Sequence, residues 1–203
     1  MTMDDKITAV LAVYHKRIAE EEATPAARDK AFHDSRLLAV GPDTGGLINI
    51  FARSLKAPNI LELGTSFGYS AIWLADAARA SGGRVTTMEL AVHKSAYARE
   101  MSAKAGLADY VDFKIGNAVE MISELKTGID FVLVDLWKDL YVPCLDAFYP
   151  KLNPGAIIVS DNMIHPRSDD TAHYAKAVRA KPGLTTIRLP VGSGLDVSLF
   201  DGR

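Results

Sequence analysis

The sequence is poor in cysteine and carries no excess of positive charge. Its one cysteine, Cys144, excludes an internal disulfide, and its place in a predicted helix (141–149) favours a buried structural thiol over a nucleophile. A formal net charge of −2 offers no basic surface to a long nucleic acid. No apolar run approaches the roughly 20 residues that span a bilayer, and the acidic start Met1–Lys6 does not resemble a secretory signal. We therefore expect a cytoplasmic protein without membrane or nucleic-acid partners.

The 203 residues fit one domain, 1–203, that opens with helices over residues 1–56. Apolar residues recur at helical spacing from Ile7 to Ile18, and a second helix is expected at about 27–38. A third helix is expected after Gly41-Pro42, with Asp43 or Thr44 as its cap. The residues expected to point from this third helix into the core are Leu47, Ile48, Ile50, Phe51 and Leu55.

From residue 59 onward, short β-branched or apolar runs alternate with helical stretches, which indicates a parallel sheet with helices on both faces. Two final runs alternate and are joined by Gly192-Ser193-Gly194, which is typical of a hairpin. The predicted fold is therefore α/β, with a mostly parallel seven-stranded sheet and an antiparallel C-terminal hairpin strand. The expected strands are 59–64, 84–90, 111–116, 130–135, 156–160, 185–191 and 195–200.

A glycine loop follows the first strand, with Gly64 and Gly68 opening the next helix. Glycines let backbone amides approach a ligand at a helix N-terminus. Glu89 ends the next strand, where a carboxylate can accept hydrogen bonds from the ribose of an adenosine cofactor. The alternative for the glycine loop is a tight strand-to-helix turn, and the alternative for Glu89 is a solvated charge at a strand end. The loop lacks the GxGxxG order of dinucleotide sites, which favours S-adenosylmethionine over NAD, with the methionine carboxylate near Gly64, Ser66 and Ser70.

A second group of polar residues lies where two other strands end. Asp135 and Lys138 follow one apolar run, and Asp161 and Asn162 follow another. Carboxylate and amide oxygens suit Mg²⁺. Helix caps, an Asx turn and a solvated lysine are the alternatives for the single residues. A cofactor loop beside a metal site indicates an enzyme.

These residues resemble catechol O-methyltransferase and its bacterial relatives, over about Leu38 to Pro166. The motifs that carry the resemblance are Leu61–Gly64 with Gly68–Ser70, Thr87–Glu89, Asp135–Asp139 with Tyr141 and Pro143, and Asp161–Asn162 with Ile164 and Pro166. The resemblance implies a Rossmann-like class I methyltransferase fold with residues 1–56 capping the active site. It also implies S-adenosylmethionine as donor, Mg²⁺ held by Asp135, Asp161 and Asn162, and Lys138 as the base.

The resemblance further implies an acceptor that is a small catechol-like or other vicinal-hydroxyl molecule, walled by Trp137 and Pro166. The residues implied to surround the donor are Val40, Gly64, Ser66, Ser70, Glu89, Leu90, Ala118 and Asp135. A homodimer through the apolar N-terminal helices is a further expectation. Two rivals remain at this stage: an NAD-dependent oxidoreductase, and a non-catalytic module that binds S-adenosylmethionine.

The chain also departs from the family pattern. The mammalian enzyme has a late carboxylate that orients the second hydroxyl of the acceptor, and here only Asp196 is a candidate for that role. Arg36 stands where an acceptor-facing aromatic residue is expected, which indicates a wider or more polar pocket. His165 and Arg167, next to the metal motif, could bind an acidic acceptor or form an exposed loop pair.

Overall fold

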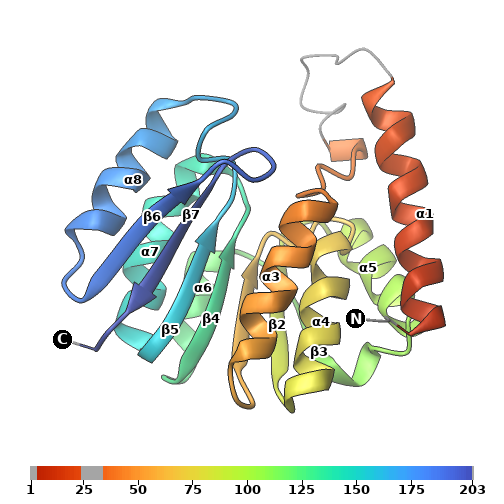
Figure 1. Cartoon of the computed structure of the whole chain (residues 1–203), viewed down its shortest axis with the longest axis horizontal. Helices are drawn as coiled ribbons and strands as arrows, with labels where there is room; N and C mark the ends of the chain where they lie inside the picture. Colours follow the sequence, from red (N-terminus) through yellow and green to blue (C-terminus); the bar gives the residue numbers. More distant parts are fainter. Residues whose placement is uncertain (1–3, 24–33, 203) are drawn as a thin grey trace.

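The computed structural model describes residues 4–23 and 34–202, and its centre is a seven-stranded sheet in the order β3-β2-β1-β4-β5-β7-β6 (Figure 1). The first five strands of that order are parallel, and β7 is antiparallel to both β5 and β6. The strands are β1 (Asn59–Leu63), β2 (Arg84–Glu89), β3 (Val111–Ile115), β4 (Ile129–Val134), β5 (Leu152–Ser160), β6 (Leu184–Leu189) and β7 (Leu195–Phe200). This confirms the predicted α/β fold with its antiparallel hairpin.

Two apolar cores lie on opposite faces of the sheet because side chains alternate along each strand. Ile60 and Phe131 belong to the core beneath α1, α3, α4 and α5, whereas Leu61 and Val132 belong to the core beneath α6, α7 and α8. The helices are α1 (Asp5–Glu22), α3 (Pro42–Ser54), α4 (Tyr69–Ser81), α5 (Val92–Lys104), α6 (Ala118–Glu124), α7 (Tyr141–Phe148) and α8 (Asp169–Ala180). Short 3-10 helices occupy Ala108–Tyr110, Lys138–Leu140 and Tyr149–Lys151.

Three local predictions differ from the structure. The helix expected at 27–38 lies largely outside the described residues, and within them only Asp34 and Ser35 are helical. Helix α3 is capped by Gly41, since neither Asp43 nor Thr44 makes a capping hydrogen bond. Pro42 occupies the first turn of α3, where its missing N–H costs nothing, so the helix begins earlier than expected. Ile50 points to solvent with 62% of its surface exposed.

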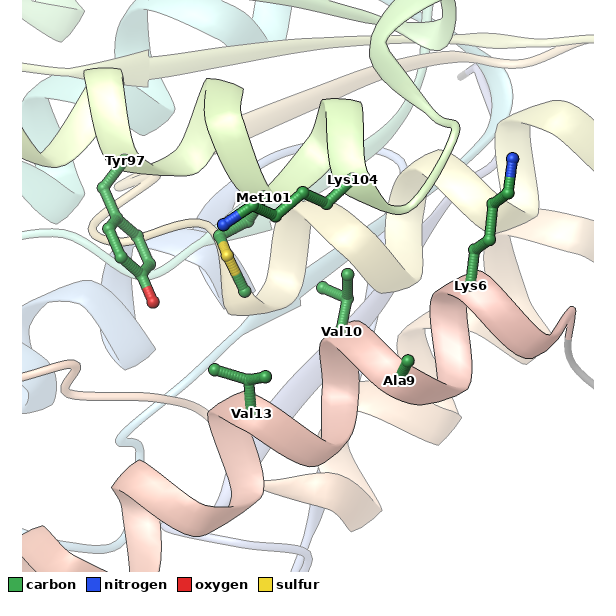
Figure 2. A pocket seen from close by; sticks show the side chains of 7 residues that line it. All are labelled: Lys6, Ala9, Val10, Val13, Tyr97, Met101 and Lys104. Carbon is green, nitrogen blue, oxygen red and sulfur yellow. The ribbon is translucent and has the colours of Figure 1, made fainter.

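A shallow apolar groove of about 340 Å³ runs between α1 and α5 (Figure 2). Val10 and Val13 of α1 face Tyr97 and Met101 of α5 across it. Its lining comes from these two helices alone, so the groove does not include the carboxyl ends of the strands. Within the described ranges, no helix combines the length and apolarity needed to cross a membrane.

Candidate active site

The glycine loop (residues 64–70) touches the end of β4 through Gly64. This residue has φ +99°, and a Cβ placed on it would lie 2.0 Å from the carbonyl oxygen of Asp135. Any side chain here would therefore collide with backbone, which makes glycine obligatory. The Asp135 N–H also donates to the Leu63 carbonyl at 2.9 Å. The glycine loop and Asp135 thus meet where β1 and β4 end side by side.

Glu89 holds the glycine loop from the other side. Its Oε2 accepts the N–H of Ser66 at 2.8 Å, and its Oε1 accepts the N–H of Ala91 at 2.9 Å. Ser66 has φ +46°, and this left-handed turn directs its N–H toward the carboxylate. The structure therefore brings two of the residues predicted to surround the donor, Glu89 and Ser66, into direct contact.

A buried carboxylate under the glycine loop was not singled out from the sequence. Glu62 is fully buried; its Oε2 accepts a hydrogen bond from the Thr87 hydroxyl at 2.5 Å, while its Oε1 has no partner among the described residues. Burial raises the pKa of Glu62 to about 7, although hydrogen bonds from Ser70 and Thr87 act in the opposite direction. An acid in the middle of an otherwise apolar strand was the available signal.

The second cluster lies at the ends of β4 and β5, and Lys138 is at its centre. The Lys138 Nζ lies 2.5 Å from Asn162 Oδ1, 3.4 Å from Asp135 Oδ1 and 3.1 Å from the Leu136 carbonyl. Asn162 has φ +58°, a left-handed conformation that asparagine tolerates and that turns its amide toward the lysine. Three of the four predicted polar residues are therefore in direct contact.

Asp161, the fourth, is buried with 2% of its surface exposed, and its Oδ1 has no hydrogen-bond partner within residues 4–23 and 34–202. Burial raises the pKa of Asp161, and the neighbouring Asp135 raises it further. Burial also raises the pKa of Asp135, against the effect of Lys138. Two desolvated carboxylates with one free oxygen form a site for which an added cation is electrostatically favourable.

The donor set fits a hard divalent ion such as Mg²⁺, with Asp135, Asp161 and Asn162 as the residues that would hold it. The ammonium of Lys138 donates hydrogen bonds to two of these three residues, Asp135 and Asn162. In the part of the chain that the structure describes, no group of three or more His, Cys, Asp or Glu side chains is arranged to hold a metal. The fit therefore depends on the mixed set of two carboxylates and one amide.

Tyr141 also belongs to this cluster, although the sequence indicated it only as part of the family motif. Its hydroxyl accepts from Lys138 Nζ at 2.7 Å and donates to the Asp161 carbonyl at 3.1 Å. Burial raises the pKa of Tyr141 well above its usual value, with Asp135 and Asp161 adding to the shift. The phenol therefore stays neutral and links the lysine to the backbone of β5.

The remaining predicted residues differ in exposure. Val40 is buried in the core beneath α1, α3, α4 and α5, and Ala118 is buried in the core beneath α6, α7 and α8. Ser70 is buried at the start of α4. Leu90 and Trp137 are 72% and 52% exposed, and Pro166 is also exposed. These exposed side chains are available to a ligand, but no described contact places them in a closed pocket.

The hairpin tip (residues 190–194) fixes the loop that follows Asn162. Ser193 accepts the N–H groups of Ile164 and His165 at 3.0 and 2.9 Å, and the Gly194 carbonyl accepts that of Met163 at 2.8 Å. On its other side, a Cβ on Gly192 would lie 2.6 Å from the Thr44 hydroxyl of α3. The tip therefore packs between the β5 loop and the start of α3.

Asp196, the candidate for the late carboxylate, is fully buried and bound to two arginines. Arg188 donates to it at 2.7 and 2.9 Å, and Arg179 donates at 2.8 and 3.3 Å. Burial acts to raise the pKa of Asp196, but the arginines outweigh it and hold the pKa below the usual range. Both oxygens are occupied, so this carboxylate joins α8 to the hairpin instead of facing an acceptor.

Comparisons with known proteins identify the family of this chain. A family model described as O-methyltransferase matches residues 15–195. A catechol O-methyltransferase of Niastella koreensis is 34% identical over 131 residues, which cover 63% of this chain and 59% of that protein. This chain therefore spans about three fifths of that relative's length. A probable O-methyltransferase of Mycobacterium tuberculosis is 32% identical over 166 residues, which cover 76% of this chain and 69% of that protein.

Among solved structures, an O-methyltransferase from Bacillus cereus in complex with SAH superposes with a TM-score of 0.78 at 26% identity. The superposition covers 98% of this chain and 92% of the Bacillus protein. The family match spans nearly the whole described structure, including the glycine loop, Glu89 and the cluster at the ends of β4 and β5. The chain belongs to the O-methyltransferase family.

Proposed function

We propose that this protein is a Mg²⁺-dependent O-methyltransferase. It transfers the methyl group of S-adenosylmethionine to a hydroxyl of a small catechol-like or other vicinal-hydroxyl acceptor. The observation that carries the metal part is the buried Oδ1 of Asp161, which lies beside Asp135 and Asn162 and has no hydrogen-bond partner in the described part of the chain. The donor part is supported by the contact of Gly64 with Asp135, which sets the glycine loop next to that oxygen cluster. The SAH bound in the Bacillus cereus relative supports the same donor.

Methyl transfer to oxygen is an in-line displacement in which the C–O bond forms as the carbon–sulfur bond breaks, so the sulfonium becomes a neutral thioether. When bound, Mg²⁺ lowers the pKa of a coordinated phenol, which is about 10 in free tyrosine, and so favours the oxyanion. After losing its own proton to solvent, the Lys138 amine would take the acceptor's proton, since its Nζ is bound to Asp135 and Asn162 of this oxygen cluster. Tyr141 and the Leu136 carbonyl orient that nitrogen.

The acceptor lies, in this proposal, between Trp137 and Pro166. Both are exposed at the edge where β4 and β5 end, and a flat phenol can stack on the indole. With Asp196 occupied by arginines, the second hydroxyl depends on the metal cluster alone. Acceptors with two adjacent oxygens are therefore favoured because both can bind one ion.

We also propose that residues 1–203 act as one methyltransferase domain whose first 56 residues cap the active site. The support comes from α1, where the Tyr14 hydroxyl donates to the Phe67 carbonyl of the glycine loop at 2.6 Å. The guanidinium of Arg17 lies 4.3 Å from the centroid of the Phe67 ring. A homodimer stays a prediction.

The test is a radiolabelled-methyl transfer screen against catechols, hydroxycinnamates and flavonoids. Each reaction is run after exhaustive chelation and again with Mg²⁺ restored. We expect transfer to at least one vicinal-hydroxyl acceptor, loss of transfer on chelation and recovery with the ion. Turnover that is unaffected by chelation would refute the metal mechanism, and binding of donor without transfer to any acceptor would favour a non-catalytic module.

A further inference from the structure

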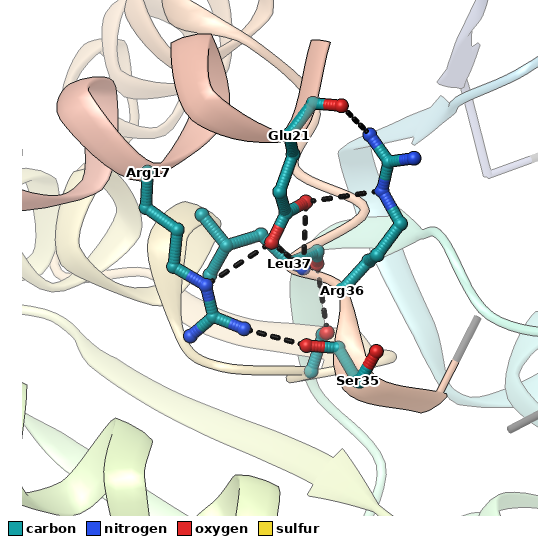
Figure 3. Close-up of polar contacts among 6 residues, drawn as sticks. Arg17, Glu21, Ser35, Arg36 and Leu37 are labelled. Atoms are coloured by element: carbon teal, nitrogen blue, oxygen red, sulfur yellow. Dashed lines mark hydrogen bonds and ion pairs between the residues drawn. The ribbon is translucent and has the colours of Figure 1, made fainter. Parts of the chain in front are cut away.

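The carboxylate of Glu21, at the end of α1, holds the chain segment that leads into α3 (Figure 3). Its two oxygens accept the backbone N–H of Leu37 at 3.0 and 3.1 Å. They also accept Arg17 Nε at 3.1 Å and Arg36 Nε at 3.4 Å. The Glu21 carbonyl accepts a second hydrogen bond from Arg36, and Arg17 donates to the Ser35 carbonyl at 2.7 Å. We call residues 35–40 the strap.

The opposite side of the strap is bound to the glycine loop. The Leu37 carbonyl accepts the Ser66 hydroxyl at 2.9 Å, and the Ser66 N–H donates to Glu89 at 2.8 Å. Hydrogen bonds therefore run in series from Glu21 through Leu37 and Ser66 to Glu89. Glu21 is outside the predicted site, yet it is connected to two residues of the proposed donor site.

Arg36 takes no part in an acceptor pocket in this arrangement. Its guanidinium is directed to the end of α1, and only 18% of its side chain is exposed. The structure therefore shows Arg36 bound to Glu21, and the wider or more polar pocket expected from the sequence stays a prediction. The arginine instead helps to fix the strap.

Helix α1 itself does not depend on Glu21 for its position. Ile7, Leu11 and Tyr14 are buried in the core, and the Tyr14 hydroxyl binds the glycine loop directly. Loss of the Glu21 carboxylate would therefore detach the Leu37 N–H from the end of α1, while α1 and the buried side chains of Leu37 and Val40 stay packed. This separates an effect on the site from an effect on folding.

We infer that Glu21 is a positioning residue that preorganises the donor site by fixing the strap against Ser66. The inference depends on the proposed donor, S-adenosylmethionine. A strap that is fixed before binding does not have to be ordered by the ligand, and this saving appears as affinity. The expected consequence of its loss is weaker donor binding with little change in the chemical step.

The test measures binding of S-adenosylhomocysteine to the whole protein by calorimetry, without metal or acceptor. We expect Glu21→Gln to weaken binding about tenfold or more, because one amide cannot satisfy the Leu37 N–H and two arginines as the carboxylate does. Glu22→Gln is the matched control. Its side chain is exposed and makes no hydrogen bond or ion pair within residues 4–23 and 34–202, so affinity should stay within twofold of wild type.

Two further measurements distinguish positioning from a general loss of structure. Hydrogen exchange at the Leu37 amide should accelerate in Glu21→Gln, while amides in β1 keep their protection. In steady state, the KM for the donor should rise about tenfold while kcat changes less than threefold. Combining Glu21→Gln with Ser66→Ala should cost less than the product of the two single effects, because both act through the strap.

If wild type binds S-adenosylhomocysteine and a folded Glu21→Gln protein binds it with the same affinity, the inference is overturned. Absence of binding in wild type would instead contradict the proposed donor. If Glu21→Gln does not fold, Arg36→Met takes its place, since it removes two contacts to Glu21 and leaves the Leu37 N–H bond. A roughly threefold loss of affinity is expected there, and no loss would also overturn the inference.

Discussion

Two buried aspartates lie on neighbouring strands, Asp196 opposite the residue that precedes Asp161, yet their environments are opposite. Asp161 follows the end of β5, whereas Asp196 of β7 pairs with Ser160 of β5. Asp196 makes four hydrogen bonds to two arginines, and its pKa is lowered. Asp161 has an oxygen with no hydrogen-bond partner among the residues that the structure describes, and its pKa is raised. A satisfied buried charge contributes to the fold, while an unsatisfied one is available to a ligand.

The strongest test of this contrast is Asp161→Asn. Because the substitution removes a proposed metal ligand, we expect Mg²⁺-dependent methyl transfer to fall by about 10³-fold, which corresponds to about 4 kcal/mol. Stability without metal should be unchanged or higher, since an uncompensated buried charge is removed. Activity assays and urea unfolding check the two parts. Asp146→Asn, at an exposed aspartate paired with Lys181, is the control and should leave both unchanged.

Asp196→Asn should have the opposite profile. Breaking a buried ion pair leaves charge without compensation and typically costs about 3–5 kcal/mol. We expect a loss of about 3 kcal/mol in the free energy of unfolding, because asparagine retains some hydrogen bonds. Urea denaturation measures this loss. Mn²⁺ affinity of the folded variant should stay within twofold of wild type; a large drop would mean that Asp196 belongs to the metal site after all.

The stability contributed by the two kinds of carboxylate should change with pH in opposite directions. Glu62 is buried and has a folded pKa of about 7, above its ordinary 4.5, so as pH rises the unfolded chain releases the proton first. Stability is therefore lost as pH rises from 4.5 to 7, by at most about 3 kcal/mol. The lowered pKa of Asp196 has the reverse effect: its contribution is present above 3.8 and is lost as pH falls below 3.8.

Unfolding curves of Glu62→Gln and wild type between pH 4.5 and 7 test whether Glu62 lowers the stability as pH rises. The difference between the two should grow in favour of Glu62→Gln between pH 4.5 and 7. The same comparison for Asp196→Asn should shrink only below pH 3.8. Parallel curves for both variants would show that the two environments do not differ as described.

The smallest expected effect concerns Lys138 as the cation already present in the cluster. Its ammonium contacts Asp135 and Asn162, so it repels an incoming ion. Lys138→Met should bind Mn²⁺ about tenfold more tightly than wild type, measured by electron paramagnetic resonance without donor or acceptor. Lys104→Met removes the same charge at an exposed ion pair and should not change the affinity. Weaker binding in Lys138→Met would contradict the arrangement.

Much of the fold was predictable because β-branched runs and glycine turns are local signals. The strand before Asp161 was the exception. It was expected at 156–160, but β5 begins at Leu152 and contains Pro154 and Gly155, which normally end a strand. A register shift between Ile129 and Phe131 of β4 accommodates them. An irregularity shared between two strands cannot be recognised from one strand's sequence.

The contacts of the site were predictable to different degrees. The Arg188–Asp196 pair follows from the hairpin register, so counting outward from the Gly192–Gly194 turn would have found it. The strap could not be found in this way, because the Glu21–Leu37 bond depends on how α1 packs against the sheet. Sequence patterns locate strand ends well, but they do not identify which side chains meet when a helix crosses them.

The hairpin tip also determines when the site is complete during synthesis. Met163, Ile164 and His165 donate their N–H groups to the carbonyls of residues 193 and 194, so these three hydrogen bonds cannot form until those residues have been made. Chains emerge from the ribosome N-terminus first, and the glycine loop is made well before this point. The glycine loop can therefore be made early in synthesis, whereas the loop that follows Asn162 is held in place only after residues 193 and 194 have been made.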